Sequence, residues 1–123
     1  MDFWYIIDKL GWRTLCKKGV KQPYTETKKI LNEITNGDET FKKDILYYTK
    51  LYRKLLVEKI SEYSIETYGD DHVFPAVSDD TYWDLTAHIV GCGKSTYDKV
   101  MEYPETLMEY LNEYVENFEY TFY

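Results

Sequence analysis

The chain has 123 residues, with 22 acidic and 15 basic side chains and a formal net charge of −7. This length predicts a single domain over residues 1–123, because it is enough for one hydrophobic core and too short for a catalytic domain plus an accessory one. The acidic balance argues against a general nucleic-acid binder, since contacts to phosphates need a basic surface.

The first half of the chain predicts three helices. Residues 2–10 carry apolar side chains at positions i, i+3, i+4 and i+7. A second helix over residues 24–35 follows Pro23 and ends at an Asn-Gly pair, which favours a C-cap and a turn. The third and longest helix begins near Asp38, a good N-cap, and continues to about Tyr63 or a little beyond. Its apolar side chains are expected in one angular sector: Phe41, Ile45, Tyr48, Tyr52, Leu55, Leu56 and Tyr63.

The second half predicts three more helices. Residues 69–77 break the helical period and contain both Gly and Pro, which indicates a loop. Ser78 then caps a helix that a Gly-Cys-Gly sequence ends, and a short helix over residues 94–101 follows. Pro104 begins the last helix, whose inner face carries Leu107, Met108, Leu111, Tyr114, Val115 and Phe118. Because no segment shows strand alternation, we predict a compact all-α bundle of five or six helices with one long central helix.

Charge is distributed unevenly along the chain. Residues 1–59 carry a net charge of +5 and residues 60–123 carry −12, with no Lys or Arg after Lys99. On the long helix, a basic stripe is expected opposite the apolar sector: Lys42, Lys43, Lys50, Arg53 and Lys54. At 100° per residue, four glutamates of the last helix fall on one face opposite its apolar side: Glu105, Glu109, Glu113 and Glu116.

This acidic face has two interpretations. One is an ordinary solvated helix face, and the other is a docking surface that attracts a basic partner and speeds its association. Tyrosines near it, among them Tyr110 and Tyr120, favour docking because they supply rigid amphipathic contact area.

Two motifs are candidates for ligand binding. The sequence Gly-Cys-Gly-Lys-Ser at residues 91–95 is similar to the tail of a P-loop, but His88 stands where a glycine is needed and no strand precedes it. Two acidic pairs, Asp70-Asp71 and Asp79-Asp80, flank the predicted loop. Helix capping explains Asp79 and Asp80 without a ligand. Together with two nearby residues they form an alternative ligand site: Asp70, Asp71, His72, Asp79, Asp80 and Trp83.

No constellation in the sequence predicts catalysis or a metal. Cys16 and Cys92 are far apart and have no zinc-finger spacing with either histidine, so we expect buried, reduced thiols in a cytoplasmic protein. His88 and Cys92 lie four residues apart and can touch on a helix, but neither an oxyanion site nor an orienting third group is recognisable. The apolar runs are too short for a signal peptide or a membrane span. We therefore assign no catalytic residue, metal or cofactor.

Short motifs along about two thirds of the chain form an ordered pattern. Phe3-Trp4 opens it, the Ser-Asp-Asp-Thr-Tyr-Trp run begins at Ser78, and Tyr-Pro-Glu-Thr-Leu closes it at residues 103–107. The pattern resembles the bacterial family called domain of unknown function 4240, although the chain departs from it over residues 69–77. The resemblance implies a compact helical domain and no established activity, so the function is inferred from the residues themselves.

From these observations we expect a small non-catalytic protein of the inhibitor or immunity type, whose acidic face neutralises a basic partner. A toxin, a nuclease or a defence protein of bacterial or phage origin is the expected class of partner, because a site that holds phosphates also attracts a polyanionic surface. Two alternatives stay open. One is an enzyme-like, ligand-binding or metal-binding domain that uses the loop at residues 70–80. The other is a self-associating homodimer, in which the basic stripe of one copy meets the acidic helix of the other.

Overall fold

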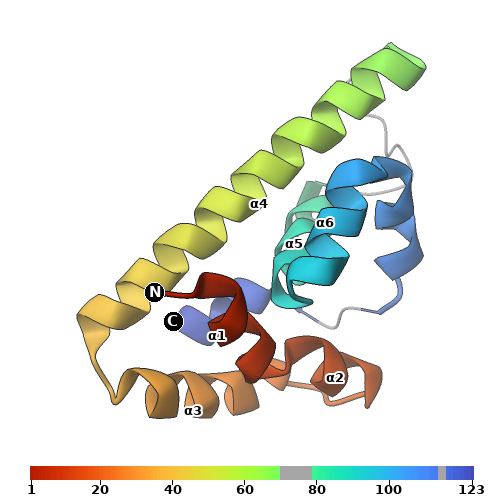
Figure 1. The fold of residues 1–123 in the computed structure, drawn as a ribbon. Helices are drawn as coiled ribbons and strands as arrows, with labels where there is room; N and C mark the ends of the chain where they lie inside the picture. Colours follow the sequence, from red (N-terminus) through yellow and green to blue (C-terminus); the bar gives the residue numbers. More distant parts are fainter. Residues whose placement is uncertain (70–78, 114–115) are drawn as a thin grey trace.

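The computed structural model describes residues 1–69, 79–113 and 116–123 (Figure 1). The described residues form six α-helices and two 3₁₀ helices and contain no strand. The prediction of an all-α fold with five or six helices and one long helix is confirmed for this part of the chain.

The N-terminal helix is the predicted one, and a short helix follows it directly. In α1 (Phe3–Leu10) the Asp2 carboxylate accepts a hydrogen bond of 3.1 Å from the backbone N–H of Tyr5. Gly11, with φ of 68°, ends α1 and precedes α2 (Trp12–Lys17). The sequence did not predict α2, because six residues are too few to show a helical period.

The two following helices were also predicted. α3 (Pro23–Thr35) ends at Asn36 in the left-handed conformation, as the Asn-Gly pair suggested. α4 (Glu39–Tyr68) begins at Asp38, whose carboxylate accepts hydrogen bonds from Thr40 and Phe41, and its 30 residues continue beyond Tyr63.

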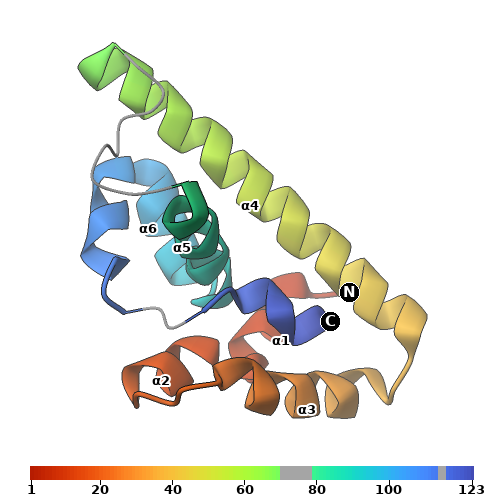
Figure 2. The ribbon, with the colours of Figure 1, turned by 180° about the vertical axis from the view of Figure 1, so that it is seen from behind.

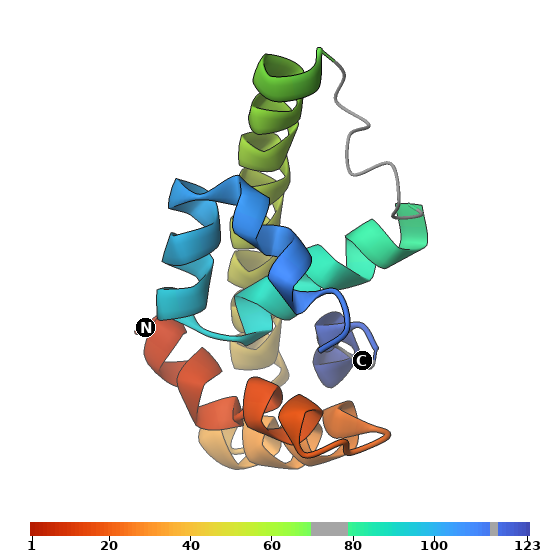
Figure 3. The ribbon, with the colours of Figure 1, turned by 90° about the vertical axis from the view of Figure 1, so that its right-hand side faces the viewer.

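The long helix defines the shape of the molecule. α1 and the end of α3 lie near the beginning of α4, α2 lies at the other end of α3, and α5 (Asp79–Gly91) and α6 (Lys94–Glu102) lie against the middle of α4 (Figures 1 and 2). The C-terminal end of α4 extends past the other described elements (Figure 3). Among the described residues near this end, Ile65 and Tyr68 are exposed.

The buried side of α4 differs from the predicted apolar sector. Half of its buried residues are polar, and both Tyr48 and Leu55 are exposed. Arg53 was predicted on a basic stripe but is buried, which is a correction explained by its partners on other elements below. The buried residues of this helix are Ile45, Thr49, Arg53, Leu56, Ile60 and Ser64.

The prediction of one last α-helix from Pro104 is wrong. The chain forms a 3₁₀ helix, η1 (Pro104–Tyr110), then turns over residues 111–113, and forms a second 3₁₀ helix, η2 (Phe118–Phe122). Turning the chain lets the fully buried Phe118 reach the core next to Trp12, where the ring centroids lie 5.2 Å apart. Tertiary contacts thus override the helical pattern of the sequence.

Gly91 permits the closest approach in this core. A Cβ atom at Gly91 would lie 2.7 Å from the Phe118 ring and 2.9 Å from the Trp12 ring, so only glycine fits between them. The sequence had suggested a helix-ending role for this glycine, and the structure adds a packing role at the last residue of α5.

Candidate functional site

The structure does not keep the four predicted glutamates on one face. Glu105 and Glu109 are exposed, and Glu109 lies 3.4 Å from Lys99. Glu113 is turned inward, and Glu116 is partly buried with its Oε1 unpaired among the described residues. Burial raises the pKa of Glu116. Because the segment is not one α-helix, spacing at 100° per residue does not describe these side chains.

The two tyrosines predicted beside the acidic face lie in different surroundings. Tyr110 is buried, with the guanidinium of Arg13 5.4 Å from its ring centroid. Tyr120 is exposed and lies on η2, where its ring makes an edge contact with Tyr24. Tyr110 therefore offers no contact area to a partner in this conformation.

Glu113 belongs to a buried polar cluster that joins three segments. Its Oε1 accepts a 2.7 Å hydrogen bond from Arg13 on α2 and lies 3.2 Å from Nε2 of His88 on α5. The indole N–H of Trp12 donates to Nδ1 of His88 at 2.9 Å, and Sγ of Cys92 lies 3.3 Å from Nε2. The predicted contact between His88 and Cys92 is present.

Hydrogen bonding determines which ring nitrogen of His88 carries the proton. An indole N–H can only donate, so Nδ1 carries the lone pair and Nε2 carries the proton, which points toward Glu113. Burial lowers the pKa of His88 to about 4, so the imidazole is neutral at pH 7. Burial by itself would raise the pKa of Glu113, but hydrogen bonds from Arg13 and His88 outweigh it and hold this pKa below its ordinary value.

The same cluster has the donor types of a metal site but suits hydrogen bonding better. Donor atoms of His88, Cys92 and Glu113 lie within 4.8 Å of one another. A metal on Nε2 would move the imidazole proton to Nδ1, where it would face the indole N–H of Trp12. Arg13 already neutralises Glu113, and burial raises the pKa of the Cys92 thiol, which disfavours the thiolate that a metal or a nucleophilic step requires.

The alternative ligand site is only partly described. Asp70, Asp71 and His72 lie outside the described residues. Asp79 and Asp80 are exposed in the first turn of α5, where the helix dipole favours negative charge. The remaining residue of this site is Trp83, and it lies in a groove that the sequence did not predict.

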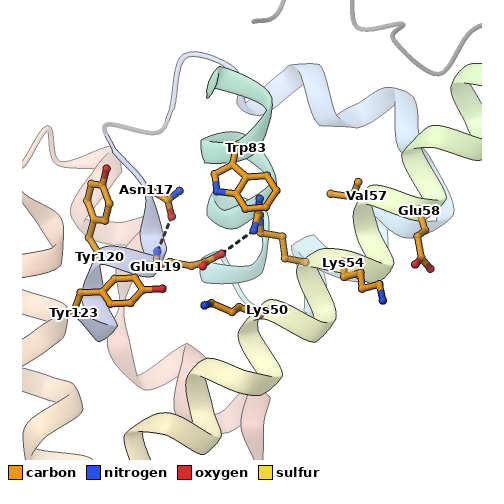
Figure 4. A pocket seen from close by; sticks show the side chains of 10 residues that line it. Lys50, Lys54, Val57, Glu58, Trp83, Asn117, Glu119, Tyr120 and Tyr123 are labelled. Carbon is orange, nitrogen blue, oxygen red and sulfur yellow. Dashed lines mark hydrogen bonds and ion pairs between the residues drawn. The ribbon is translucent and has the colours of Figure 1, made fainter. Parts of the chain in front are cut away.

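This groove lies between α4, α5 and η2 and has a volume of about 710 Å³ (Figure 4). Figure 4 shows lysines of α4 on one side, tyrosines near η2 on the other, and the indole of Trp83 from α5. We call it the Arg53 groove, defined by its lining residues: Lys50, Arg53, Lys54, Val57, Glu58, Trp83, Asn117, Glu119, Tyr120 and Tyr123.

Arg53 is held firmly at the base of this groove. Its Nη1 donates to Oε2 of Glu119 at 3.1 Å, and its Nε donates to the hydroxyl of Thr86 at 3.2 Å. The guanidinium lies against the Trp83 ring, with Cζ 2.9 Å from the ring centroid. Burial lowers the pKa of Arg53, although Glu119 opposes this effect.

A second, smaller groove of about 270 Å³ is acidic. Glu62 and Glu66 reach it from α4, and Glu102 and Glu105 from the junction of α6 and η1. None of these four exposed carboxylates forms an ion pair with a described residue. We call it the acidic groove, and its lining residues are Lys59, Glu62, Tyr63, Glu66, Glu102, Tyr103, Pro104 and Glu105.

The fold and these sites define a small all-α protein whose described residues include a buried polar cluster, the Arg53 groove and the acidic groove. The chain belongs to the family described as protein of unknown function (DUF4240), whose model matches residues 1–123, and the resemblance seen in the sequence is thereby confirmed. Neither a curated protein nor a solved structure matches the chain. Among the residues that the structure describes, no helix is long and apolar enough to cross a membrane.

Sequence reasoning missed both grooves for identifiable reasons. Each joins segments that are distant in the chain, and their pairing is decided by tertiary structure. One signal was present: Arg53 continues the i, i+4 spacing of Ile45 and Thr49 and is followed by Leu56 and Ile60, which places it on the buried stripe.

Proposed function

We propose that this protein is a non-catalytic binding module of the inhibitor or immunity type, which captures a basic protein partner in the acidic groove. The supporting observation is the convergence on one depression, from two separate segments, of four carboxylates that form no ion pair with a described residue, with Lys59 as the one cation among the described lining residues. This retains the class of function expected from the sequence and moves the surface away from Glu113 and Glu116, whose carboxylates are partly or largely buried.

The chemistry of the acidic groove suits lysine and arginine side chains. Tyr63 and Tyr103 line it beside the carboxylates, so a bound cation can pair with a glutamate and lie over an aromatic ring. Interaction with Glu102 raises the pKa of Tyr103, as expected for a phenol in a negative field. A toxin or nuclease with a phosphate-binding surface presents the matching positive charge, and such complementarity raises association rates in a salt-dependent way.

The buried polar cluster supports a non-catalytic role. The neutral His88, the protonated Cys92 and the Arg13-paired Glu113 satisfy one another inside the protein. This arrangement stabilises the fold and does not hold an activated nucleophile toward solvent.

The test is the affinity of the full chain for a basic protein captured from its host, measured at several salt concentrations. Glu102→Lys/Glu105→Lys should weaken binding at least about tenfold and flatten the salt dependence. The matched control, Glu33→Lys/Asp44→Lys, changes the net charge equally at exposed positions outside the groove and should bind with nearly unchanged affinity. Equal losses in the two variants would show that only net charge matters and would overturn the proposal.

A further inference from the structure

The Arg53 groove contains a buried charged donor that the fold leaves unused. Arg53 is 4% exposed, and its Nη2 has no hydrogen-bond partner among the described residues. An unpaired donor on a buried charge is costly, so the well-held guanidinium, whose Nη2 is buried without a partner, gains if an acceptor reaches that nitrogen. Carboxylates and phosphates are the acceptors that a guanidinium recognises best.

The groove is positively charged, although the whole chain is acidic. Glu119 compensates Arg53, and among the described lining side chains this leaves Lys50 and Lys54 against one further carboxylate, that of Glu58. Neither lysine forms an ion pair within the described ranges, and the Lys50 ammonium lies 5.8 Å from the ring centroid of Tyr123. An anionic ligand therefore gains charge compensation that the groove itself does not provide.

The walls of the groove are aromatic and accessible. Trp83 is 55% exposed, Tyr120 is 49% exposed and Tyr123 is 68% exposed, and Val57 adds an aliphatic surface on α4. Exposed rings around a concave site offer stacking surfaces to a planar ligand. The volume of about 710 Å³ lies within the range of roughly 300–1,000 Å³ that is usual for small-molecule sites.

We propose that the Arg53 groove binds a small molecule composed of a planar ring and one anionic group, either a carboxylate or a phosphate. The ring lies against Trp83 and the tyrosines, and the anionic group contacts Lys50, Lys54 and the unpaired Nη2 of Arg53. Because the indole of Trp83 lies on the guanidinium, it shifts when the ligand reaches Nη2. The site shares no residue with the acidic groove, so it stands independently of the proposed protein partner.

Calorimetric titration of the full chain with four probes tests the class of ligand. Adenosine monophosphate carries ring and phosphate, indole-3-acetate carries ring and carboxylate, and adenosine and inorganic phosphate each lack one part. We expect at least one complete probe to bind with a Kd below about 1 mM and the incomplete probes to bind at least about tenfold more weakly. The preferred complete probe identifies phosphate or carboxylate as the anionic group. If no complete probe reaches this affinity, the proposal is overturned.

Variants locate the site without disturbing the buried Arg53 pair. Lys50→Gln/Lys54→Gln should weaken the best probe at least about tenfold, whereas Lys18→Gln/Lys43→Gln removes the same charge elsewhere and should leave affinity unchanged. The tryptophan fluorescence change on binding should disappear in Trp83→Phe, while calorimetry still detects the ligand. Equal affinities of the two lysine variants, or a fluorescence change that persists in Trp83→Phe, would contradict the assignment.

Discussion

At the residue scale, His88 shows how one hydrogen bond controls a titratable group. The indole N–H of Trp12 occupies the lone pair of Nδ1, so a second proton on the imidazole would place two donors face to face. The ring has no exposed surface, and protonation therefore lacks compensation from water as well. His88 consequently acts as a neutral bridge between Trp12 and Glu113.

The pKa of His88 predicts how stability depends on pH. It falls from 6.5 to about 4 on folding, so the unfolded chain binds more protons between these values and stability decreases as the pH falls through this window. The loss should reach about 3 kcal/mol near pH 4. Glu113 acts in the same direction below its unfolded pKa, because folding also lowers its pKa.

Denaturant unfolding at pH 7, 5.5 and 4.5 checks this prediction. His88→Gln keeps a donor for Glu113 but cannot titrate, so its free energy of unfolding should change less with pH than that of the parent, although the variant is less stable at pH 7. Parallel pH profiles of the two proteins would show that His88 is not the group responsible.

At the element scale, α4 depends on a capped beginning. Its 30 residues span about 45 Å at 1.5 Å per residue, and its C-terminal end extends past the other described elements (Figure 3). Asp38 satisfies the N–H groups of Thr40 and Phe41 at the other end, at 2.9 and 3.2 Å. The cap therefore stabilises the beginning of the helix, and buried residues from Ile45 to Ser64 pack along most of its length.

Asp38→Ala should reduce the free energy of unfolding by about 1 kcal/mol, because two backbone donors lose their acceptor. Asp44→Ala removes the same charge from an exposed position inside α4 and should change stability by no more than about 0.5 kcal/mol. Thermal and denaturant unfolding measure the free energy of unfolding of both variants. Equal losses of stability would show that the change in net charge, and not the lost cap, is responsible.

At the scale of the whole molecule, two arginine–glutamate ion pairs among the described residues help to attach the C-terminal segment to the rest of the fold. Arg13 on α2 holds Glu113 at 2.7 Å, and Arg53 on α4 holds Glu119 at 3.1 Å. Both arginines come from the basic half of the chain and both glutamates from the acidic half. The uneven charge seen in the sequence therefore serves, in part, to join the two halves internally.

Glu119→Gln should destabilise the protein by about 3 kcal/mol, because it leaves the buried Arg53 charge without compensation. The control is Glu109→Gln, which breaks an exposed pair with Lys99 and should cost no more than about 1 kcal/mol. Chemical denaturation distinguishes these values, and a small loss in Glu119→Gln would mean that Arg53 finds another acceptor or water.

Local sequence signals were sufficient for most helices. Asp38, Pro23 and the Asn-Gly pair marked helix ends correctly because capping depends on residues within one turn of each other. The C-terminal segment was misread, since its spacing fits an α-helix while Phe118 and Glu113 have their partners on α2 and α5. The candidate site was predicted less well than the fold. Of the site residues predicted from the sequence, Glu105 lies in the acidic groove, and Trp83 and Tyr120 lie in the Arg53 groove.

The sequence by itself determined the all-α class, the long helix, the family and the separation of charge, because these follow from periodicity, caps and composition. Only the tertiary structure decided which charges are available at the surface. Arg53 and Glu113 are neutralised inside by partners 66 and 100 residues away in the chain, whereas the glutamates of the acidic groove form no ion pair within the part of the chain that the structure describes. Pairing across such separations depends on how the helices pack, and no local pattern encodes it.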